Sequence, residues 1–571
     1  MNKILEHLIA LYGSQVGRTA FDRIELLISN YQPRIPAPQV SGLTERDAIL
    51  ITYGDQVCSP DAPPLQTLAD FCAQYLRNVI SSIHLLPFFP YSSDDGFSVI
   101  DYKAVHPALG DWEDVTRFRR HFRLMFDAVL NHVSAQSEWF QSFLHDDPRC
   151  RDYFIVVPDG VDLSQVIRPR TLPLLTRFST PSGTKNVWTT FSTDQIDLNY
   201  RNPAVLLEMV DTLLSYAARG AELIRLDAIA FLWKEFGTTC LNLPETHRVI
   251  QLVRTVLDEV APHVILVTET NVPHVDNVSY FGDGTDEAHM VYNFALPLLT
   301  LHSFHSGNAT TLSRWAGNLS LPSPRVTLFN FLASHDGIGL NPARGILADS
   351  EIDALVARTL AHAGLVSYKQ NSDGTTSPYE LNINYFDALS DPNADESLEM
   401  QVDRFIAAQA IMLSLVGVPG IYFHSLVGSR GWRDGVAATG QNRTINREKF
   451  DVGALEHELA DLGSRRNKVF ARYTQLLYVR SAHPAFDPYG AMRVLNANPS
   501  IFSVLRVASE GASVLCLHNV SSHLQTAELN LSQTLGGESR DLVDLISGHA
   551  YDGREAIRLA PYQMLWLTHR R

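Results

Sequence analysis

The sequence has few cysteines, and their arrangement fits neither a disulfide-rich nor a metal-binding protein. The chain has 571 residues, and five of them are cysteines: Cys58, Cys72, Cys150, Cys240 and Cys516. Their number is odd, they are widely scattered, and none has the short spacing of a zinc or redox motif. We therefore expect reduced thiols and a cytoplasmic protein.

Long apolar runs and an excess of positive charge are also lacking. The N-terminal segment MNKILEHLIALYGSQ is interrupted by Glu6 and His7, so it offers no signal-peptide core. No later segment approaches the length and apolarity of a membrane span. The formal net charge is -16. We therefore expect neither nucleic acid nor an anionic membrane surface as a partner.

Metal-binding motifs are likewise missing. The chain contains no H-E-x-x-H motif and no close His/Asp ligand pair. We therefore predict no metal site and no cofactor. The composition, with 45% hydrophobic and 19% charged residues, is typical of a soluble globular enzyme.

Eight short β-rich segments alternate with helical stretches from residue 46 onward. They are AILITYGD, SSIHLLPFFP, RLMFDAVLNH, ELIRLDAI, VILVTET, EAHMVYNF, RVTLFNFLASHD and PGIYFHSL. Strands separated by helices pair in parallel, and eight of them suit a barrel whose active site lies where the strands end. The predicted fold class is α/β: a (β/α)8 TIM barrel with inserted loop subdomains, a helical N-terminal extension and a C-terminal antiparallel β domain.

The predicted boundaries follow changes in the sequence pattern. Residues 1–45 begin with helical spacing and end in the breaker-rich stretch YQPRIPAP, which indicates a helical extension. Residues 46–484 would form the barrel, with insertions at about 133–200 and 337–405 that are too long for simple crossovers. Residues 485–571 contain alternating segments such as SIFSVLRV and indicate the β domain.

Three carboxylates stand at the ends of predicted strands. In LIRLDAI, Arg225 and Asp227 are two residues apart and so leave the same face of a strand. Glu269 closes the strand in VTETN, and Asp336 follows His335 in LASHDG. Alone, an R-x-D sequence is more often a local ion pair and a His-Asp pair more often structural. The whole set is typical of a carboxylate-driven sugar site.

The order and spacing of FDAVLNH, LIRLDAI, VTETN and LASHDG resemble the four conserved regions of the α-amylase superfamily, glycoside hydrolase family thirteen. Three further stretches, SHDGIG, DDGF at residues 94–97 and GQNRTINR at residues 440–447, resemble its sucrose-phosphorylase branch. The resemblance covers roughly residues 46 to 571. It implies a retaining reaction by double displacement on an α-glucoside.

The resemblance also implies a role for each acid. Asp227 would be the nucleophile, and Glu269 would act first as acid and then as base. Arg225 would keep Asp227 ionised and oriented through charge-assisted hydrogen bonds. Asp336 and His335 would hold sugar hydroxyls and favour distortion toward the transition state.

Three more residues are implied to bind the glucosyl unit. His132 would contact a hydroxyl, whereas its neighbours Asp127 and Asn131 would support the architecture. Asp94 and Arg443 would close the far end of a pocket for a single sugar. The alternative for this last pair is two separate surface charges.

Transfer to phosphate requires fixed positive charge on the acceptor side. Guanidinium groups suit both phosphate and carboxylate, and the first long insertion and the NPARG stretch supply them. The alternative for each arginine is a solvated surface charge. The candidates for acceptor or phosphate binding are Arg168, Arg170, Arg177, Arg344, Tyr379 and Glu380.

The stretches SHDGIGLNPARGIL, RPRTLPLL and SPYELNINYFDAL, with the longer N-terminus, are more similar to glucosylglycerate phosphorylases than to sucrose phosphorylases. This implies reversible phosphorolysis of 2-O-α-D-glucosylglycerate to α-D-glucose 1-phosphate and D-glycerate by a monomer or homodimer. Sucrose or sucrose 6'-phosphate remains an alternative substrate. An α-glucosidase or transglucosylase and an inactive amylase-like binding subunit are further alternatives, although such subunits usually lose the nucleophile or acid that this chain retains.

Overall fold

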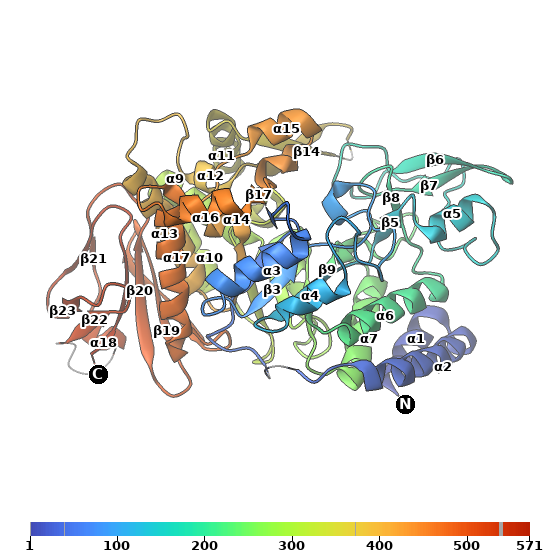
Figure 1. Cartoon of the computed structure of the whole chain (residues 1–571), viewed down its shortest axis with the longest axis horizontal. Coiled ribbons are helices and arrows are strands. Elements are labelled where there is room, and N and C mark those ends of the chain that lie inside the picture. Colours follow the sequence, from blue (N-terminus) through green and yellow to red (C-terminus); the bar gives the residue numbers. More distant parts are fainter. Residues whose placement is uncertain (1, 39, 41, 372, 536–540, 571) are drawn as a thin grey trace.

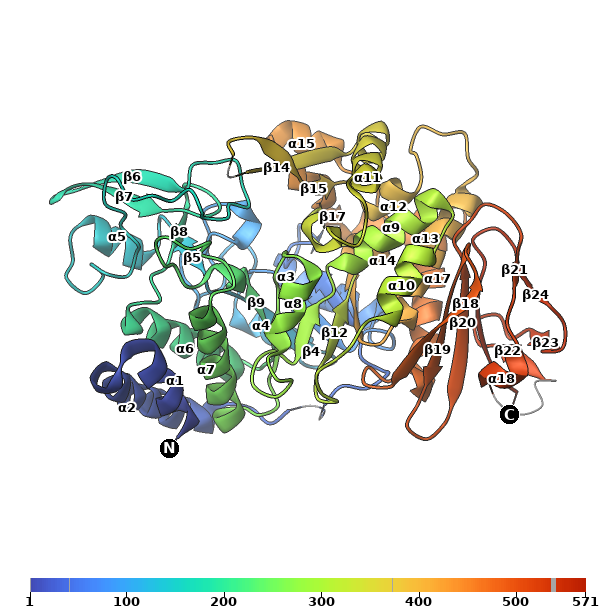
Figure 2. The same cartoon turned by 180° about the vertical axis from the view of Figure 1, so that it is seen from behind.

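The protein has a central barrel with added elements at both ends of its long axis. The computed structural model describes residues 2–38, 40, 42–371, 373–535 and 541–570. The remaining positions of the predicted extension, second insertion and β domain lie outside the described residues. The N-terminal helices and the C-terminal sheet lie at opposite ends of the molecule, with the barrel between them (Figures 1 and 2).

Among the described residues, eight parallel strands close the barrel in the order β1-β16-β12-β11-β10-β9-β4-β3. Every residue of these strands is buried, as expected for a parallel barrel covered by helices. Six strands fall within predicted segments and β9 and β16 each begin one residue earlier than predicted, so the predicted TIM barrel is confirmed. The strands are β1 (Ile49–Thr52), β3 (Ser82–Leu85), β4 (Arg123–Val129), β9 (Ala221–Asp227), β10 (Ile265–Thr268), β11 (Met290–Tyr292), β12 (Thr327–Asn330) and β16 (Val418–Tyr422).

Amphipathic helices cover the barrel. In α7, for example, Val249, Val253, Val256 and Val260 recur every three or four residues and are buried. The helix begins at Pro244, whose fixed φ suits the first turn. The covering helices are α3 (Pro64–Tyr75), α4 (Trp112–Phe118), α6 (Pro203–Ala218), α7 (Pro244–Val260), α9 (Ala295–Ser306), α10 (Thr310–Gly317), α13 (Leu398–Ser414) and α17 (Arg465–Ser481). None of the helices in the described part of the chain is long and apolar enough to cross a membrane.

The N-terminal extension is a pair of helices, α1 (Lys3–Tyr12) and α2 (Ser14–Tyr31), rather than a single helix. Gly13 ends α1 with a φ of 76°, a backbone conformation that favours glycine. Gly17 lets the helices approach closely, because a Cβ there would lie 2.9 Å from the backbone of Leu8 and Ile9. The pair packs on barrel helices, α1 on α7 and α2 on α6.

Both long insertions form small substructures along one edge of the barrel (Figure 1). In the first, β5 pairs with β8 and β6 pairs with β7. In the second, the strands form a sheet in the order β13-β15-β14. The first contains β5 (His132–Ser134), α5 (Glu138–Leu144), β6 (Leu175–Thr180), β7 (Gly183–Trp188) and β8 (Gln195–Asp197). The second contains β13 (Ile338–Gly339), α11 (Asp349–Ala361), β14 (Leu365–Gln370), β15 (Thr376–Asn382) and α12 (Tyr385–Leu389).

The C-terminal region is an antiparallel sheet, which confirms the predicted β domain. Its described strands are β18 (Ala491–Asn498), β19 (Ile501–Val507), β20 (Ser513–Asn519), β22 (Leu542–Asp544), β23 (Ala550–Tyr551) and β25 (Met564–His569), accompanied by β21 (Gln525–Ala527), β24 (Ile557–Leu559) and α18 (Leu531–Leu535). A buried arginine on β19, Arg506, joins the sheet to the barrel region, because it donates to the carbonyl of Leu415 at 2.6 Å. On the barrel side, Arg480 at the end of α17 donates to the carbonyl of Gly417 at 3.1 Å and to that of Phe486 at 3.3 Å. The carbonyls of Leu415 and Gly417 follow α13, so these arginines satisfy groups left free near the helix end.

Further strands and helices complete the barrel region. They include the parallel pair β2 (Val57–Cys58) and β17 (Phe450–Asp451) and the helices α8 (His274–Val278), α14 (Phe423–Leu426), α15 (Arg433–Thr439) and α16 (Val452–Ala460).

Candidate active site

The three predicted acids meet at the C-terminal ends of the barrel strands. Asp227 is the last residue of β9, and Glu269 directly follows β10. Leu226 pairs with Thr268, so Asp227 and Glu269, which directly follow these two residues, lie at the same level of the barrel. Asp336 lies in the loop after β12. The sequence prediction that these acids converge where strands end agrees with the structure.

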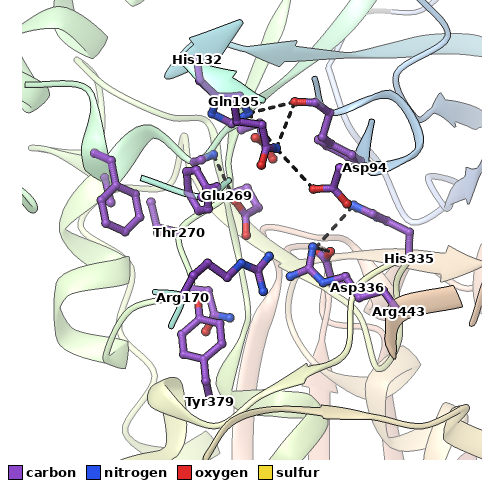
Figure 3. Close-up of a pocket in the computed structure, with 17 residues that line it drawn as sticks. Asp94, His132, Arg170, Gln195, Glu269, Thr270, His335, Asp336, Tyr379 and Arg443 are labelled. Atoms are coloured by element: carbon purple, nitrogen blue, oxygen red, sulfur yellow. Dashed lines mark hydrogen bonds and ion pairs between the residues drawn. The ribbon is translucent and has the colours of Figure 1, made fainter. Parts of the chain in front are cut away.

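These acids line one cavity together with most of the predicted sugar and acceptor residues (Figure 3). His132 and Gln195 lie on one side of the cavity in this view, and Arg170 and Tyr379 lie on the opposite side, with Glu269 between them. The predicted residues that line it are Asp94, His132, Arg170, Asp227, Glu269, His335, Asp336, Tyr379 and Arg443.

Arg225 lies behind the acids and contacts three carboxylates. Its Nη1 is 2.8 Å from Asp227 Oδ1 and also contacts Asp127 Oδ1. Its Nη2 is 3.9 Å from Glu269 Oε2. The side chain is only 2% exposed, so water screens these interactions little. One buried guanidinium therefore links the two carboxylates that line the cavity floor.

The surroundings of Asp227 and Glu269 favour one shared proton. Burial raises the pKa of Asp227; Arg225 opposes this rise and Glu269 adds to it. Burial likewise raises the pKa of Glu269, and Asp336 raises it further. Because Asp227 makes the short contact with Arg225, the geometry assigns the charge to Asp227 and the proton to Glu269. An ionised carboxylate and a protonated carboxyl group thus stand side by side.

The backbone at Ala228 helps to orient Glu269. Ala228 has a φ of 51°, in the left-handed region that non-glycine residues seldom adopt. Its N–H donates to Glu269 Oε2 at 3.1 Å. A strained backbone position therefore lies between the two acids and contacts one of them directly.

Aromatic and polar side chains form the wall of the cavity. The ring of Phe97 stacks on His335 with centroids 4.7 Å apart and an interplanar angle of 3°. His132 Nε2 lies 2.9 Å from the Phe97 carbonyl oxygen and 3.2 Å from Gln195 Nε2. Gln195 Nε2 also donates to Asp94 Oδ2 at 3.3 Å. Such a wall offers a flat apolar surface and several hydrogen-bonding groups to a sugar ring.

Glu380 is a buried anchor for two arginines and does not line the cavity. It accepts hydrogen bonds from Arg443 Nε at 3.1 Å and Arg443 Nη2 at 2.9 Å. Arg443 Nη1 also lies 2.5 Å from Asp336 Oδ1. Arg170 Nη1 is 3.8 Å from Glu380 Oε2, a longer contact than those that Arg443 makes with the same carboxylate.

Three predicted acceptor arginines lie away from the cavity. Arg168 donates to the carbonyl of Leu172 within its own loop. Arg177 is exposed on β6, where its Nε donates to Asn186 Oδ1 at 3.3 Å. Arg344 Nη1 lies 3.7 Å from Asp349, which is 90% exposed. The loops and the strand that carry these three arginines direct their side chains away from the cavity. Of the four arginines predicted for the acceptor side, Arg170 is the one that lines it.

The structure adds residues that the sequence prediction missed. Asp94 and Arg443 both line the cavity, and Asp94 Oδ1 also lies 3.6 Å from Nη1 of Arg447, which was not predicted as a site residue. Arg447 also donates to the His335 carbonyl at 3.0 Å. It stands at the end of the quoted motif GQNRTINR, so a signal was present. Gln195 carried no such signal, because it lies in the long first insertion.

The donor set offers little to a cation. Among the described residues, no group of three or more His, Cys, Asp or Glu side chains is placed to hold a metal ion. In the cavity, arginines already neutralise Asp227 and Asp336.

Comparison with known proteins agrees with this geometry. Residues 73–336 match the family described as "Alpha amylase, catalytic domain". The chain is 51% identical to the glucosylglycerate phosphorylase of Allomeiothermus silvanus, over 99% of this chain and 98% of that protein. It is 48% identical to the glucosylglycerate phosphorylase of Spirochaeta thermophila, over 100% and 98% of the two chains. The structure of sucrose 6F-phosphate phosphorylase from Thermoanaerobacter thermosaccharolyticum is similar with a TM-score of 0.73 and 23% identity, covering 85% of this chain and 96% of that one. The chain is a member of the α-amylase superfamily and, within it, belongs to the family of the glucosylglycerate phosphorylases.

Proposed function

We propose that the protein catalyses the reversible phosphorolysis of 2-O-α-D-glucosylglycerate to α-D-glucose 1-phosphate and D-glycerate, with retention. The observation that carries the proposal is the buried pair Asp227 and Glu269 on one guanidinium, facing a cavity that also presents Arg170. The names and high identity of the relatives support the choice of substrate. The cysteine pattern leads us to place this reaction in the cytoplasm.

In the first half-reaction, the carboxylate of Asp227 attacks the anomeric carbon. The bond from that carbon to the glycerate oxygen breaks, and Glu269 gives its proton to this oxygen. Glycerate leaves, and a β-linked glucosyl ester of Asp227 remains. Arg225 keeps Asp227 ionised before the attack and steadies Glu269 after it becomes negative.

In the second half-reaction, a phosphate oxygen attacks the same carbon from the side that glycerate left. Glu269, now a carboxylate, takes the proton of the attacking phosphate hydroxyl. The ester bond to Asp227 breaks, and α-D-glucose 1-phosphate is released. Two inversions give net retention, and the site returns to its starting protonation state.

Arg170 and Tyr379 are the proposed binding groups for the acidic acceptor. Arg443 already makes the short hydrogen bonds to Glu380, so the guanidinium of Arg170 keeps donors for a ligand. A guanidinium binds phosphate and carboxylate in the same forked manner. This chemistry favours binding of phosphate and glycerate over binding of neutral fructose. Fructose 6-phosphate, the acceptor released from sucrose 6'-phosphate, is also anionic, so an assay must distinguish it from glycerate.

The test is an acceptor panel. Purified protein with glucose 1-phosphate is given D-glycerate, fructose, fructose 6-phosphate or glycerol, and phosphate release is measured. The proposal predicts the highest kcat/KM with D-glycerate and phosphate-dependent cleavage in reverse. Faster reaction with fructose or fructose 6-phosphate contradicts the substrate, and equal cleavage without phosphate contradicts phosphorolysis. Asp227→Asn, which should lose at least about 10,000-fold in kcat, is the control for contaminating activity.

A further inference from the structure

A line of buried ionisable side chains runs through adjacent barrel strands beneath the cavity. It begins at His84 on β3, continues through Asp127 on β4 and ends with Arg225 and Asp227 on β9. His84 pairs with Met125 in the strand register, and Asp127 pairs with Arg225. Because side chains alternate along a strand, Met125 and Asp127 share a face, and His84 is diagonal to Asp127 on it.

Short polar contacts join the members of this line. His84 Nε2 is 2.7 Å from Asp127 Oδ2. The other oxygen of Asp127 accepts from Arg225 Nη1, the same nitrogen that lies 2.8 Å from Asp227 Oδ1. The side chains of His84 and Asp127 are both 0% exposed. Each oxygen of Asp127 therefore has one protein donor, in a place shielded from solvent.

The protonation states follow from burial and charge. Burial lowers the pKa of His84, and Asp127 only partly opposes this shift, so the imidazole is neutral. Burial would raise the pKa of Asp127, but Arg225 and His84 outweigh it and the pKa lies below its usual value. A neutral imidazole beside a carboxylate must carry its hydrogen on Nε2. Nδ1 then has no hydrogen-bond partner among the described residues, so within this part of the chain the polar contact of the His84 side chain is with Asp127.

The orientation of Arg225 depends on this arrangement. Asp127 and Asp227 both accept a hydrogen bond from Nη1 of Arg225, so a movement of Asp127 would change the orientation of the guanidinium relative to Asp227. Without His84, Asp127 Oδ2 would be a buried charged acceptor with no donor, a state that favours rotation or protonation of the carboxyl. We propose that His84 is a positioning residue, which through Asp127 holds Arg225 in the orientation that keeps Asp227 ready to attack. The proposal rests on the proposed role of Asp227 as nucleophile.

The experiment compares His84→Leu with His84→Gln, whose side-chain amide can still donate toward Asp127. The donors are glucosylglycerate with phosphate and α-D-glucosyl fluoride, whose fluoride release reports formation of the glucosyl-enzyme whatever the natural acceptor is. We expect His84→Leu to lower kcat at least about tenfold with both donors, while the KM for phosphate changes by less than about threefold. His84→Gln should recover to within about threefold of the parent.

Two controls separate positioning from general damage. His518 is also fully buried but lies on β20 of the C-terminal sheet, so His518→Leu should leave kcat unchanged. Adding His84→Leu to Asp127→Asn should slow the enzyme no further than Asp127→Asn alone, because both break the same line. If His84→Leu does not fold, His84→Met takes its place.

Two outcomes overturn the proposal. One is a His84→Leu or His84→Met enzyme with parental kcat. The other is equal loss in the leucine and glutamine variants. A parent enzyme that releases fluoride but ignores glucosylglycerate would contradict the proposed substrate alone, and the comparison at His84 would still stand.

Discussion

Replacing Arg170 by alanine should impair transfer to phosphate much more than formation of the glucosyl-enzyme. The side chain lines the cavity opposite His132 (Figure 3), is 24% exposed, and has its Nη1 3.8 Å from Glu380 Oε2. A hydrogen bond to a charged group contributes about 1.5–3 kcal/mol. Since about 1.4 kcal/mol is a factor of ten, kcat/KM for phosphate should fall about 10- to 150-fold.

The assay measures each half-reaction separately. Formation of glucose 1-phosphate from glucosylglycerate is followed as phosphate is varied, which gives kcat/KM for phosphate. The first turnover of fluoride release from α-D-glucosyl fluoride reports the first half-reaction, and this donor has no glycerate carboxylate for Arg170 to bind. Arg170→Lys keeps the charge but loses the planar fork, so it should fall between the parent and the alanine variant.

Arg168→Ala is the matched control, because Arg168 lies in the same loop but directs its guanidinium to the carbonyl of Leu172. It should retain kcat/KM for phosphate to within about twofold, as expected for a surface substitution. Equal losses in Arg168→Ala and Arg170→Ala would refute the assignment of the acceptor side. So would an Arg170→Ala enzyme in which fluoride release slows as much as phosphate transfer.

Other predictions test the role of Glu269 as the acid, the raised pKa of Glu269, and the contribution of the buried Lys234–Asp197 ion pair to stability. Glu269→Gln should lose about 100- to 10,000-fold with glucosylglycerate. It should lose less with α-D-glucosyl fluoride, because fluoride leaves without a proton; equal losses would argue against Glu269 as the acid. Burial and Asp336 raise the pKa of Glu269 above its ordinary 4.5, so kcat/KM for glucosylglycerate should fall as pH rises through that raised pKa. Asp336→Asn removes one negative neighbour, so this limb of the residual pH profile should move to lower pH, and a move to higher pH would contradict the reasoning. Lys234 Nζ is 2.6 Å from buried Asp197, so Lys234→Met should lower the free energy of unfolding by about 3–5 kcal/mol in denaturant titrations. The double variant with Asp197→Asn should lose less than the two single losses added together, and full additivity would exclude a coupled pair.

Local pattern was enough to predict the barrel. Each of the eight predicted segments matches one barrel strand to within one residue, because a strand covered on both faces is a continuous apolar run and its ends are marked by polar residues. The same pattern placed Asp227 and Glu269, since residues at the ends of parallel strands share one edge. The N-terminal helix pair was predicted only as helical spacing, because the turn at Gly13 depends on one backbone conformation.

The acceptor side shows where local pattern stops being informative. Arg168 and Arg170 are two residues apart in a loop without regular periodicity, so their spacing does not say which one turns inward. Glu380 is a candidate ligand in the sequence but is an anchor in the structure, because it meets Arg443 across 63 positions of the chain. Arg447 and His84 act through contacts of the same long-range kind.

The sequence by itself determined the barrel, the positions of its three acids and the arginine beside the first, because strand periodicity and motif spacing are local properties of the chain. Only the tertiary structure decided which charges face the cavity and which neutralise one another behind it. That division arises from contacts between distant segments in a place shielded from water, where every buried charge requires a partner.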